Sequence, residues 1–484
     1  MCALTRAAGS RAASYRDART DLKALAGAPQ MAAGFRPNRE HLLLAAVAAL
    51  SAGTTITFGF LAAPAIVFVL LALVLMWMAL RAQPSTAGAG WWACAAALTA
   101  SVYLVYASRL SLPVETALTF VLAAAVATIP TVSSHRARQA ATAVAVTTLL
   151  AMAAAAWQWG VLDVDVFNSV QNASSALIHG VNPYLTTFVT PVQTGPHSFA
   201  YATIHFQYLP GVALLAAPAR LLGDVRVMSV VAFAVLTLFT VLLATQSETG
   251  RERAPRILAM SLALPMTVAM VHYALVDVYA VAGFAGWMLL RREHPRWAVL
   301  CLVVALTIKP TILIALVAPL LWSRRARREV VYAAAGAALV VLPFMFITGV
   351  AAFYQDVLGI QVTLGFRYNG LTLSAAWYAL TGHLVPVWFG LLAGVLVAAT
   401  VLRRRPRDVA DVMHAAALLS IAAFLLAKWA FLNYYFIPAW LLMLALAGRG
   451  VPFEAAAEDI ALPRPWPGAL RWPKQIAAHA PGGG

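Results

Sequence analysis

Two aspartates, Asp163 and Asp165, open the most polar stretch of an otherwise apolar chain, GVLDVDVFNSVQNASSALIHGVNPY at residues 160–184. A carboxylate near a membrane surface can act as a general base that takes a proton from a hydroxyl group. Partial desolvation raises the pKa of such a carboxylate and suits it to this role. An aspartate that precedes a helix is also a common N-cap. Both residues are therefore candidates for a catalytic base, with helix capping as the alternative.

The residues after these aspartates have the spacing of an amphipathic helix over residues 166–180. The apolar side chains of one face are Phe167, Val170, Ala173, Leu177 and Ile178. The polar side chains of the other face are Asn168, Gln171, Asn172, Ser175 and His179. This pattern predicts a short helix in the plane of the membrane interface. Gly180 is expected to end the helix, and the Asn-Pro-Tyr sequence at 182–184 to form a turn.

Three cationic residues, Lys309, Arg367 and Lys428, are candidates for binding a phosphate group. An ionisable side chain near membrane depth is a functional hypothesis in its own right. For Lys309 the alternative is a side chain that extends to the interface, and for Arg367 it is an ordinary loop residue. Lys428 begins the aromatic segment KWAFLNYYF, so a place at the membrane interface is its alternative.

Polar side chains of the types that contact sugars occur in three further short segments. They are His205, Gln207, Tyr208, His272, Asp277, Tyr368 and Asn369. The first three residues precede Pro210 and would line an acceptor pocket, or else form a polar edge on an element that dips into the membrane. Asp277 would hold sugar hydroxyls or pair with a lysine. Tyr368 and Asn369 also suit a turn.

Composition places all of these residues in a membrane protein. The chain of 484 residues is 62% hydrophobic and only 11% charged. Apolar runs of about 20 residues recur, and each is long enough to cross the hydrocarbon core of about 30 Å as a helix. The net charge of +16 comes from short basic clusters between these runs, such as HRAR and SRRARR, so nucleic acid is not an expected partner. The three cysteines are scattered and have no disulfide or metal-ligand spacing.

The basic clusters also set the expected topology, because cytoplasmic loops carry an excess of Lys and Arg. Five crossings from an internal N-terminus place residue 161 outside. Basic residues flank the apolar run 297–322 on both sides, which predicts a hairpin of two short helices that turns at Lys309-Pro310. One long helix with a proline kink is the alternative. With the hairpin, the candidate residues of every segment face the outer compartment.

Four parts are expected along the chain. Residues 1–40 form a basic cytoplasmic segment, and residues 41–138 a membrane module of four helices. Residues 139–447 form the membrane domain that carries the candidate site. Residues 448–484 form a proline-rich cytoplasmic tail.

The motif D-x-D-V-F-N-S-V, followed by G-V-N-P-Y and then QYLPGVALLAAPARLLG, resembles polyprenyl-phosphate-sugar-dependent glycosyltransferases of the GT-C superfamily. It is most similar to actinobacterial family 87 mannosyltransferases, and the resemblance covers residues 139–447. In that superfamily an acidic residue opens the first external loop, a juxtamembrane helix follows, and a G-x-x-P-Y-like turn closes it. The resemblance implies an all-α polytopic bundle of about 13–14 transmembrane helices with an external juxtamembrane helix.

The resemblance also implies an inverting transfer of a sugar, mannose, from a polyprenyl-phosphate donor to a lipid-linked or cell-envelope glycan. The reaction would occur at the outer leaflet of the plasma membrane. Asp165 is the preferred base because its spacing to Gly180 matches the superfamily better than that of Asp163. The lipid phosphate would leave toward Lys309 or Lys428. A lipid-linked sugar flippase and an envelope polysaccharide ligase or polymerase are the alternatives, and the sequence leaves the need for a divalent metal open.

Overall fold

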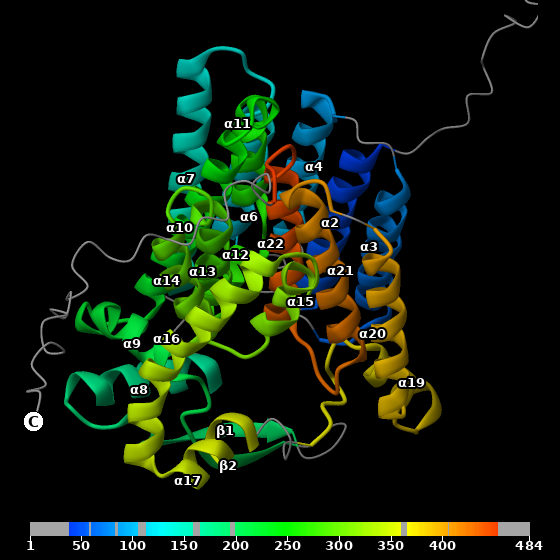
Figure 1. Ribbon diagram of the computed structural model, residues 1–484. Helices are drawn as coiled ribbons and strands as arrows, with labels where there is room; N and C mark the ends of the chain where they lie inside the picture. Colours follow the sequence, from blue (N-terminus) through cyan, green and yellow to red (C-terminus); the bar gives the residue numbers. More distant parts are fainter. Residues whose placement is uncertain are drawn as a thin grey trace, which may run out of the picture.

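The computed structural model describes residues 38–57, 60–82, 86–104, 113–157, 165–193, 199–359, 365–404 and 406–453. Helices make up most of these residues (Figure 1). The first group comprises α2 (Arg39–Thr55), α3 (Ala63–Arg81), α4 (Ala89–Ser101) and α6 (Pro113–Thr128). These correspond to the four helices expected in the N-terminal module. The expectation of an all-α polytopic membrane protein is confirmed.

Long apolar helices cross the bundle in the rest of the chain. They are α7 (His135–Trp157), α10 (Arg226–Thr245), α16 (Arg324–Thr348) and α21 (Val409–Leu426), in addition to α3 of the first group. Helix α20 (Val387–Leu402) is shorter, with 16 residues. Helices α11 (Glu248–Ala263) and α12 (Met266–His272) form one apolar pair bent by 52°. By length and composition, five helices of the described residues can span a membrane alone, and this bent pair makes a sixth. Several of the expected crossings are shorter apolar helices.

The centre of the bundle is formed by α13 (Asp277–Leu290), α21 and α22 (Leu432–Ala447). Nearly every residue of these helices is buried, including large side chains such as Trp287 and Trp440. A helix that is apolar on all sides is expected in such a place, because neighbouring helices cover its whole circumference. The ends of these helices therefore have fixed positions, and the candidate site lies at one of these ends.

Helices α14 (Pro295–Leu306) and α15 (Ile312–Trp322) confirm the hairpin predicted at Lys309-Pro310. Arg291 precedes α14, yet its carbonyl accepts a hydrogen bond from Arg325 and its guanidinium donates to Ser323 Oγ, just after α15. Arg291 and Arg325 also share the buried carboxylate of Glu329. The two basic flanks thus meet at the same end of the bundle. The alternative of one long kinked helix is wrong.

The two helices of this hairpin are too short to cross a bilayer. They have 12 and 11 residues, and the adjacent α13 has 14. At about 1.5 Å per residue they reach about 17–21 Å, whereas the hydrocarbon core is about 30 Å thick. The tip at Lys309 and the start of α13 at Asp277 therefore lie below the level that a full span would reach.

An interfacial layer lies over this tip, at the lower end of the molecule in Figure 1. Helix α8 (Asp165–Ile178) confirms the predicted amphipathic helix, and Gly180, with φ 72°, ends it in the left-handed conformation. The Asn-Pro-Tyr turn forms a short 3-10 helix, Pro183–Leu185. Helix α9 (Pro210–Leu221) packs on α8. Leu221 and Leu222, at the end of α9, expose most of their side chains, as expected at an interface with lipid.

The layer also contains a feature that the sequence analysis did not predict, an antiparallel pair of strands. Strand β1 (Thr187–Gln193) pairs with β2 (Phe199–His205), with Thr187 opposite His205. The chain returns through α17 (Val350–Tyr354), a π-helical turn (Gln355–Gly359) and α19 (Leu373–Thr381) at the same end of the bundle (Figure 1). The interfacial layer is thus assembled from two segments far apart in the sequence.

The first residues of α9 rest directly on the hairpin tip. Gly211 N donates to Thr307 O at 3.1 Å, and a Cβ atom at Gly211 would meet that same oxygen at 2.6 Å. Pro210 occupies the first turn of α9, where its missing N–H has no consequence. The sequence Leu-Pro-Gly at 209–211 therefore docks the interfacial layer on the tip that bears Lys309.

Replacement of Gly211 by alanine should lower both stability and activity. The added methyl group would push α9 away from the hairpin tip, at a cost of about 1–3 kcal/mol in free energy of unfolding. The matched control is Gly394→Ala in α20, where a Cβ atom would meet nothing within 4 Å. Thermal unfolding in detergent should show a lower midpoint for the first variant only. Equal midpoints for both variants would contradict the close docking.

Candidate active site

Asp165 stands at the head of α8 and faces two cations from distant segments. Its carboxylate interacts electrostatically with Arg367 and Lys309, and with the side chain of Gln207. Its Oδ1 also accepts a hydrogen bond of 2.8 Å from Val166 N. Burial raises the pKa of Asp165, and the hydrogen bond and the two cations only partly offset this. Such a carboxylate is closer to the pH range in which a general base works.

Gln207 and Tyr208 reach Asp165 because the Asn-Pro-Tyr turn holds their segment. Tyr184 Oη donates a hydrogen bond of 2.7 Å to Tyr208 O, and its ring packs against Phe206 at 5.3 Å between centroids. Asn182 accepts from Tyr184 N and so fixes the turn itself. The turn that closes α8 therefore fixes the backbone of the segment that precedes α9.

Lys309 and Asp277 form a buried ion pair across the hairpin tip. Lys309 Nζ lies 3.1 Å from Asp277 Oδ1 and 3.3 Å from Oδ2, and the Asp277 side chain is 1% exposed. Asn433 Nδ2 donates to Asp277 Oδ2 at 3.0 Å. A lysine is one of the partners predicted for Asp277 from the sequence, and the structure identifies it as Lys309. Lys309 thus has its charge balanced within the protein.

The start of α22 contributes two residues that the sequence analysis did not select, Asn433 and Tyr434. Lys309 Nζ lies 4.3 Å from the centroid of the Tyr434 ring, and Tyr434 Oη accepts a hydrogen bond from Trp429 Nε1 at 3.0 Å. Lys428 Nζ in turn lies 4.2 Å above the Trp429 ring. The aromatic segment KWAFLNYYF contained the only sequence signal for these contacts. Tyr434 and Trp429 of this segment thus connect Lys309 with Lys428.

Arg367 is carried on a loop that two other segments fix by backbone hydrogen bonds. Arg367 N donates to Lys428 O at 3.4 Å, and Leu371 N donates to Ala430 O at 2.8 Å. On the other side, Leu61 N donates to Asn369 O at 2.8 Å. Burial lowers the pKa of the Arg367 guanidinium, and the charge of Asp165 opposes that shift. Within the described residues, the Arg367 side chain has no hydrogen-bond or ion-pair partner, so its donors can bind a ligand.

The other candidate residues lie around this cluster or outside it. Tyr368 packs against the Tyr378 ring at 4.8 Å, in an aromatic group, while Asn369 Oδ1 is buried and has no hydrogen-bond partner among the described residues. His272 is buried against Tyr273 at the end of α12. His205, at the end of β2, is exposed and interacts with Asp356, whose pKa burial raises. Asp163 lies outside the described residues.

The structure therefore joins residues of five predicted segments in one cluster, which we call the carboxylate–cation cluster. It consists of Asp165, Gln207, Tyr208, Asp277, Lys309, Arg367 and Tyr434. Asp165, whose pKa is raised by burial, faces Arg367, whose guanidinium has no hydrogen-bond or ion-pair partner among the described residues. Lys309 lies beside them and is already paired with Asp277. Among the described residues, no group of three or more His, Cys, Asp or Glu side chains is arranged to hold a metal ion.

A double-mutant cycle should show how strongly Lys309 and Asp277 interact. Lys309→Gln leaves the buried carboxylate without its cation, and loss of one partner of a buried pair costs about 3–5 kcal/mol in free energy of unfolding. Adding Asp277→Asn should restore much of that loss, because no buried charge then remains. Thermal midpoints of the two single variants and the double variant give the comparison. Additive losses would show that the two side chains do not interact.

Comparison with known proteins gives a match to one protein family. No curated protein and no solved structure matches the chain. A family model, that of glycosyltransferase family 87, matches residues 206–449. The match begins beside Gln207, ends just after α22 and contains both Lys309 and Arg367. Because it covers half of the 484 residues, the chain belongs to glycosyltransferase family 87 and is a membrane glycosyltransferase.

Proposed function

We propose that the protein transfers mannose from a polyprenyl-phosphate carrier to a hydroxyl group of a lipid-linked or cell-envelope glycan. The observation that carries the proposal is the approach of Asp165 to Arg367, two residues from opposite halves of the chain. Transfer from a lipid phosphate to a hydroxyl requires a base and a cation for the leaving phosphate. The cluster offers both in one place.

In the proposed reaction, Asp165 takes the proton from the acceptor hydroxyl. The acceptor oxygen attacks the anomeric carbon of the donor sugar, and the bond between that carbon and the phosphate oxygen breaks. The electron pair of this bond leaves with the lipid phosphate, whose added negative charge the Arg367 guanidinium stabilises. Attack and departure on opposite faces of the sugar invert the anomeric configuration. Asp163 remains the second candidate for the base.

The two lysines have different parts in this proposal. Lys309 pairs with Asp277, which also accepts a hydrogen bond from Asn433. Lys309 therefore fixes the hairpin tip, and its positive charge acts on Asp165. Lys428 lies on the loop that also holds the Arg367 backbone, and burial lowers its pKa. We assign the first contact with the donor phosphate to Arg367 and the second to Lys428. Gln207 and Tyr208, which interact with each other and with Asp165, are assigned to the acceptor side.

The outer face of the plasma membrane is the proposed location of the reaction. The basic flanks of the hairpin meet at the end of α13 opposite Asp277, and cytoplasmic ends of membrane helices carry such basic clusters. A lipid-linked donor is consistent with this location, since its carrier anchors the sugar in the membrane beside the recessed site. His205 and the β1–β2 hairpin would then face the outer compartment.

Transfer from labelled polyprenyl-phosphate-mannose to a membrane lipid extract should depend on Asp165. Asp165→Asn keeps an oxygen to accept from Val166 N but removes the base, so the rate should fall about 10²–10⁴-fold. The matched control is Asp408→Asn, which changes an aspartate that accepts from Asp411 N at the head of α21. The control should retain transfer, and the thermal midpoint of Asp165→Asn should not fall below that of the wild type. Full activity of Asp165→Asn would exclude Asp165 as the base. If the wild type transfers only other lipid-linked sugars, the proposed donor, polyprenyl-phosphate-mannose, is wrong.

The pH profile of transfer should have an acidic limb set by Asp165. Activity requires the ionised carboxylate, and burial raises its pKa above the ordinary value of 3.8. Activity should therefore fall as the pH decreases through a midpoint above 3.8. Rates measured against pH in lipid nanodiscs give this midpoint. A midpoint at or below the ordinary value would contradict the assignment.

A further inference from the structure

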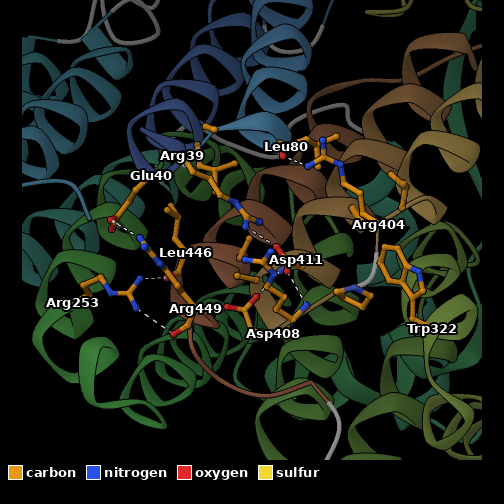
Figure 2. Close-up of a pocket in the computed structure, with 18 residues that line it drawn as sticks. Arg39, Glu40, Leu80, Arg253, Trp322, Arg404, Asp408, Asp411, Leu446 and Arg449 are labelled. Atoms are coloured by element: carbon orange, nitrogen blue, oxygen red, sulfur yellow. Dashed lines mark hydrogen bonds and ion pairs between the residues drawn. The ribbon is translucent and has the colours of Figure 1, made fainter. Parts of the chain in front are cut away.

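A cavity of about 600 Å³ lies at the other end of α21 and α22, far along these helices from the carboxylate–cation cluster. Asp408 and Asp411 at the start of α21 line it, and so does Arg449 just after α22 (Figure 2). The first turn of α2, which begins just before the module expected from residue 41, contributes Arg39 and Glu40. The cavity is thus a junction between the module and the rest of the bundle.

Its lining contains an excess of positive charge. The arginines are Arg39, Arg253, Arg404, Arg407 and Arg449, and the carboxylates are Glu40, Asp408 and Asp411. Arg39 pairs with Asp411 at 2.6 Å, and Arg449 pairs with Glu40 at 3.3 Å. Arg253 is buried and donates to the carbonyls of Leu446 and Arg449. These contacts occupy the inner arginines.

Arg404 and Arg407 are the outer arginines, and neither forms an ion pair with a carboxylate of the described residues. Both residues are exposed. Arg404 donates to the carbonyl of Leu80, which is a neutral partner. The Arg407 guanidinium has no hydrogen-bond or ion-pair partner among the described residues. Two arginines three positions apart at the edge of one cavity suit a phosphate group, because guanidinium groups bind phosphate oxygens in a bidentate manner.

The inner wall offers two further features for a ligand. Glu40 Oε2 accepts from Ala87 N and Arg449, whereas the buried Oε1 atom has no hydrogen-bond partner among the described residues. That oxygen can accept from a hydroxyl group of a ligand. The rest of the wall is largely aliphatic, with Leu43, Val401 and Leu446 among its residues. Cations at the edge and hydrocarbon within match an amphiphile that bears a phosphate and a hydroxyl group.

We propose that this cavity binds a phosphate-bearing ligand, with Arg404 and Arg407 holding the phosphate and Glu40 accepting from a hydroxyl group. An anionic phospholipid with a polyol headgroup has this chemistry, and free phosphate shares the charged part of it. Since the basic end of the bundle is the expected cytoplasmic end, the lipid would come from the inner leaflet. A ligand here would join α2 of the N-terminal module to α21 and α22. The site is independent of the sugar-transfer reaction.

Thermal unfolding of the full chain in detergent tests the proposal. Dioleoylphosphatidylglycerol should raise the midpoint of the wild type by several degrees, and dioleoylphosphatidylcholine should not. Arg404→Gln combined with Arg407→Gln should remove most of this shift. The matched control is Arg324→Gln combined with Arg328→Gln, two exposed arginines at the start of α16 that do not line the cavity. It should keep the shift of the wild type.

A third arm with inorganic phosphate identifies the source of the ligand. A shift with inorganic phosphate that the Arg404/Arg407 variant loses would support the site with a soluble ligand. A shift with phosphatidylglycerol alone would support a lipid. The proposal fails if neither compound shifts the midpoint of the wild type. It also fails if the Arg404/Arg407 variant responds as strongly as the control variant.

Discussion

The ion pair between Lys309 and Asp277 is the interaction on which the geometry of the site depends. It joins the tip of the α14–α15 hairpin to the first residue of α13, and Asn433 extends it to the first turn of α22. Three short elements therefore end at one point below the membrane surface. A buried pair of this kind contributes little net stability, but removal of one partner leaves a charge without compensation. The pair thus penalises arrangements in which the three ends separate.

A second network fixes the opposite end of the hairpin. Glu329 binds Arg291 and Arg325, and it also accepts from Trp287 Nε1 at 2.8 Å. With both ends held, the short helices cannot slide along α13. The depth of Lys309 then follows from the number of residues in each helix. Gly211 rests on Thr307 at this tip, so the interfacial layer and Asp165 take their height from the same helices.

The sequence predicted the elements whose signals are local. The spacing of Phe167, Val170 and Ala173 predicted α8, and Gly180 predicted where it ends. Both signals are local, because an amphipathic helix and a left-handed C-cap each depend on neighbouring residues. The basic flanks predicted the hairpin, since each flank favours the same side of the membrane, and Pro310 predicted the place of its turn. The strands β1 and β2 were missed, although Phe199, Tyr201 and Thr203 alternate with smaller side chains. Asn433 and Tyr434 were missed because only their tertiary contacts distinguish them from an interfacial aromatic segment.

No candidate site residue lies in the N-terminal module, yet its contacts connect it with the site. Phe60 bridges to Gly370, and its ring packs against Phe431 at 5.8 Å. Leu61 N donates to Asn369 O on the loop that carries Arg367. These contacts come from residues before 206, outside the stretch that matches the family. The position of Arg367 relative to Asp165 therefore depends on a part of the chain that the family model does not include, and at its other end this same part contributes Arg39 and Glu40 to the arginine-lined cavity.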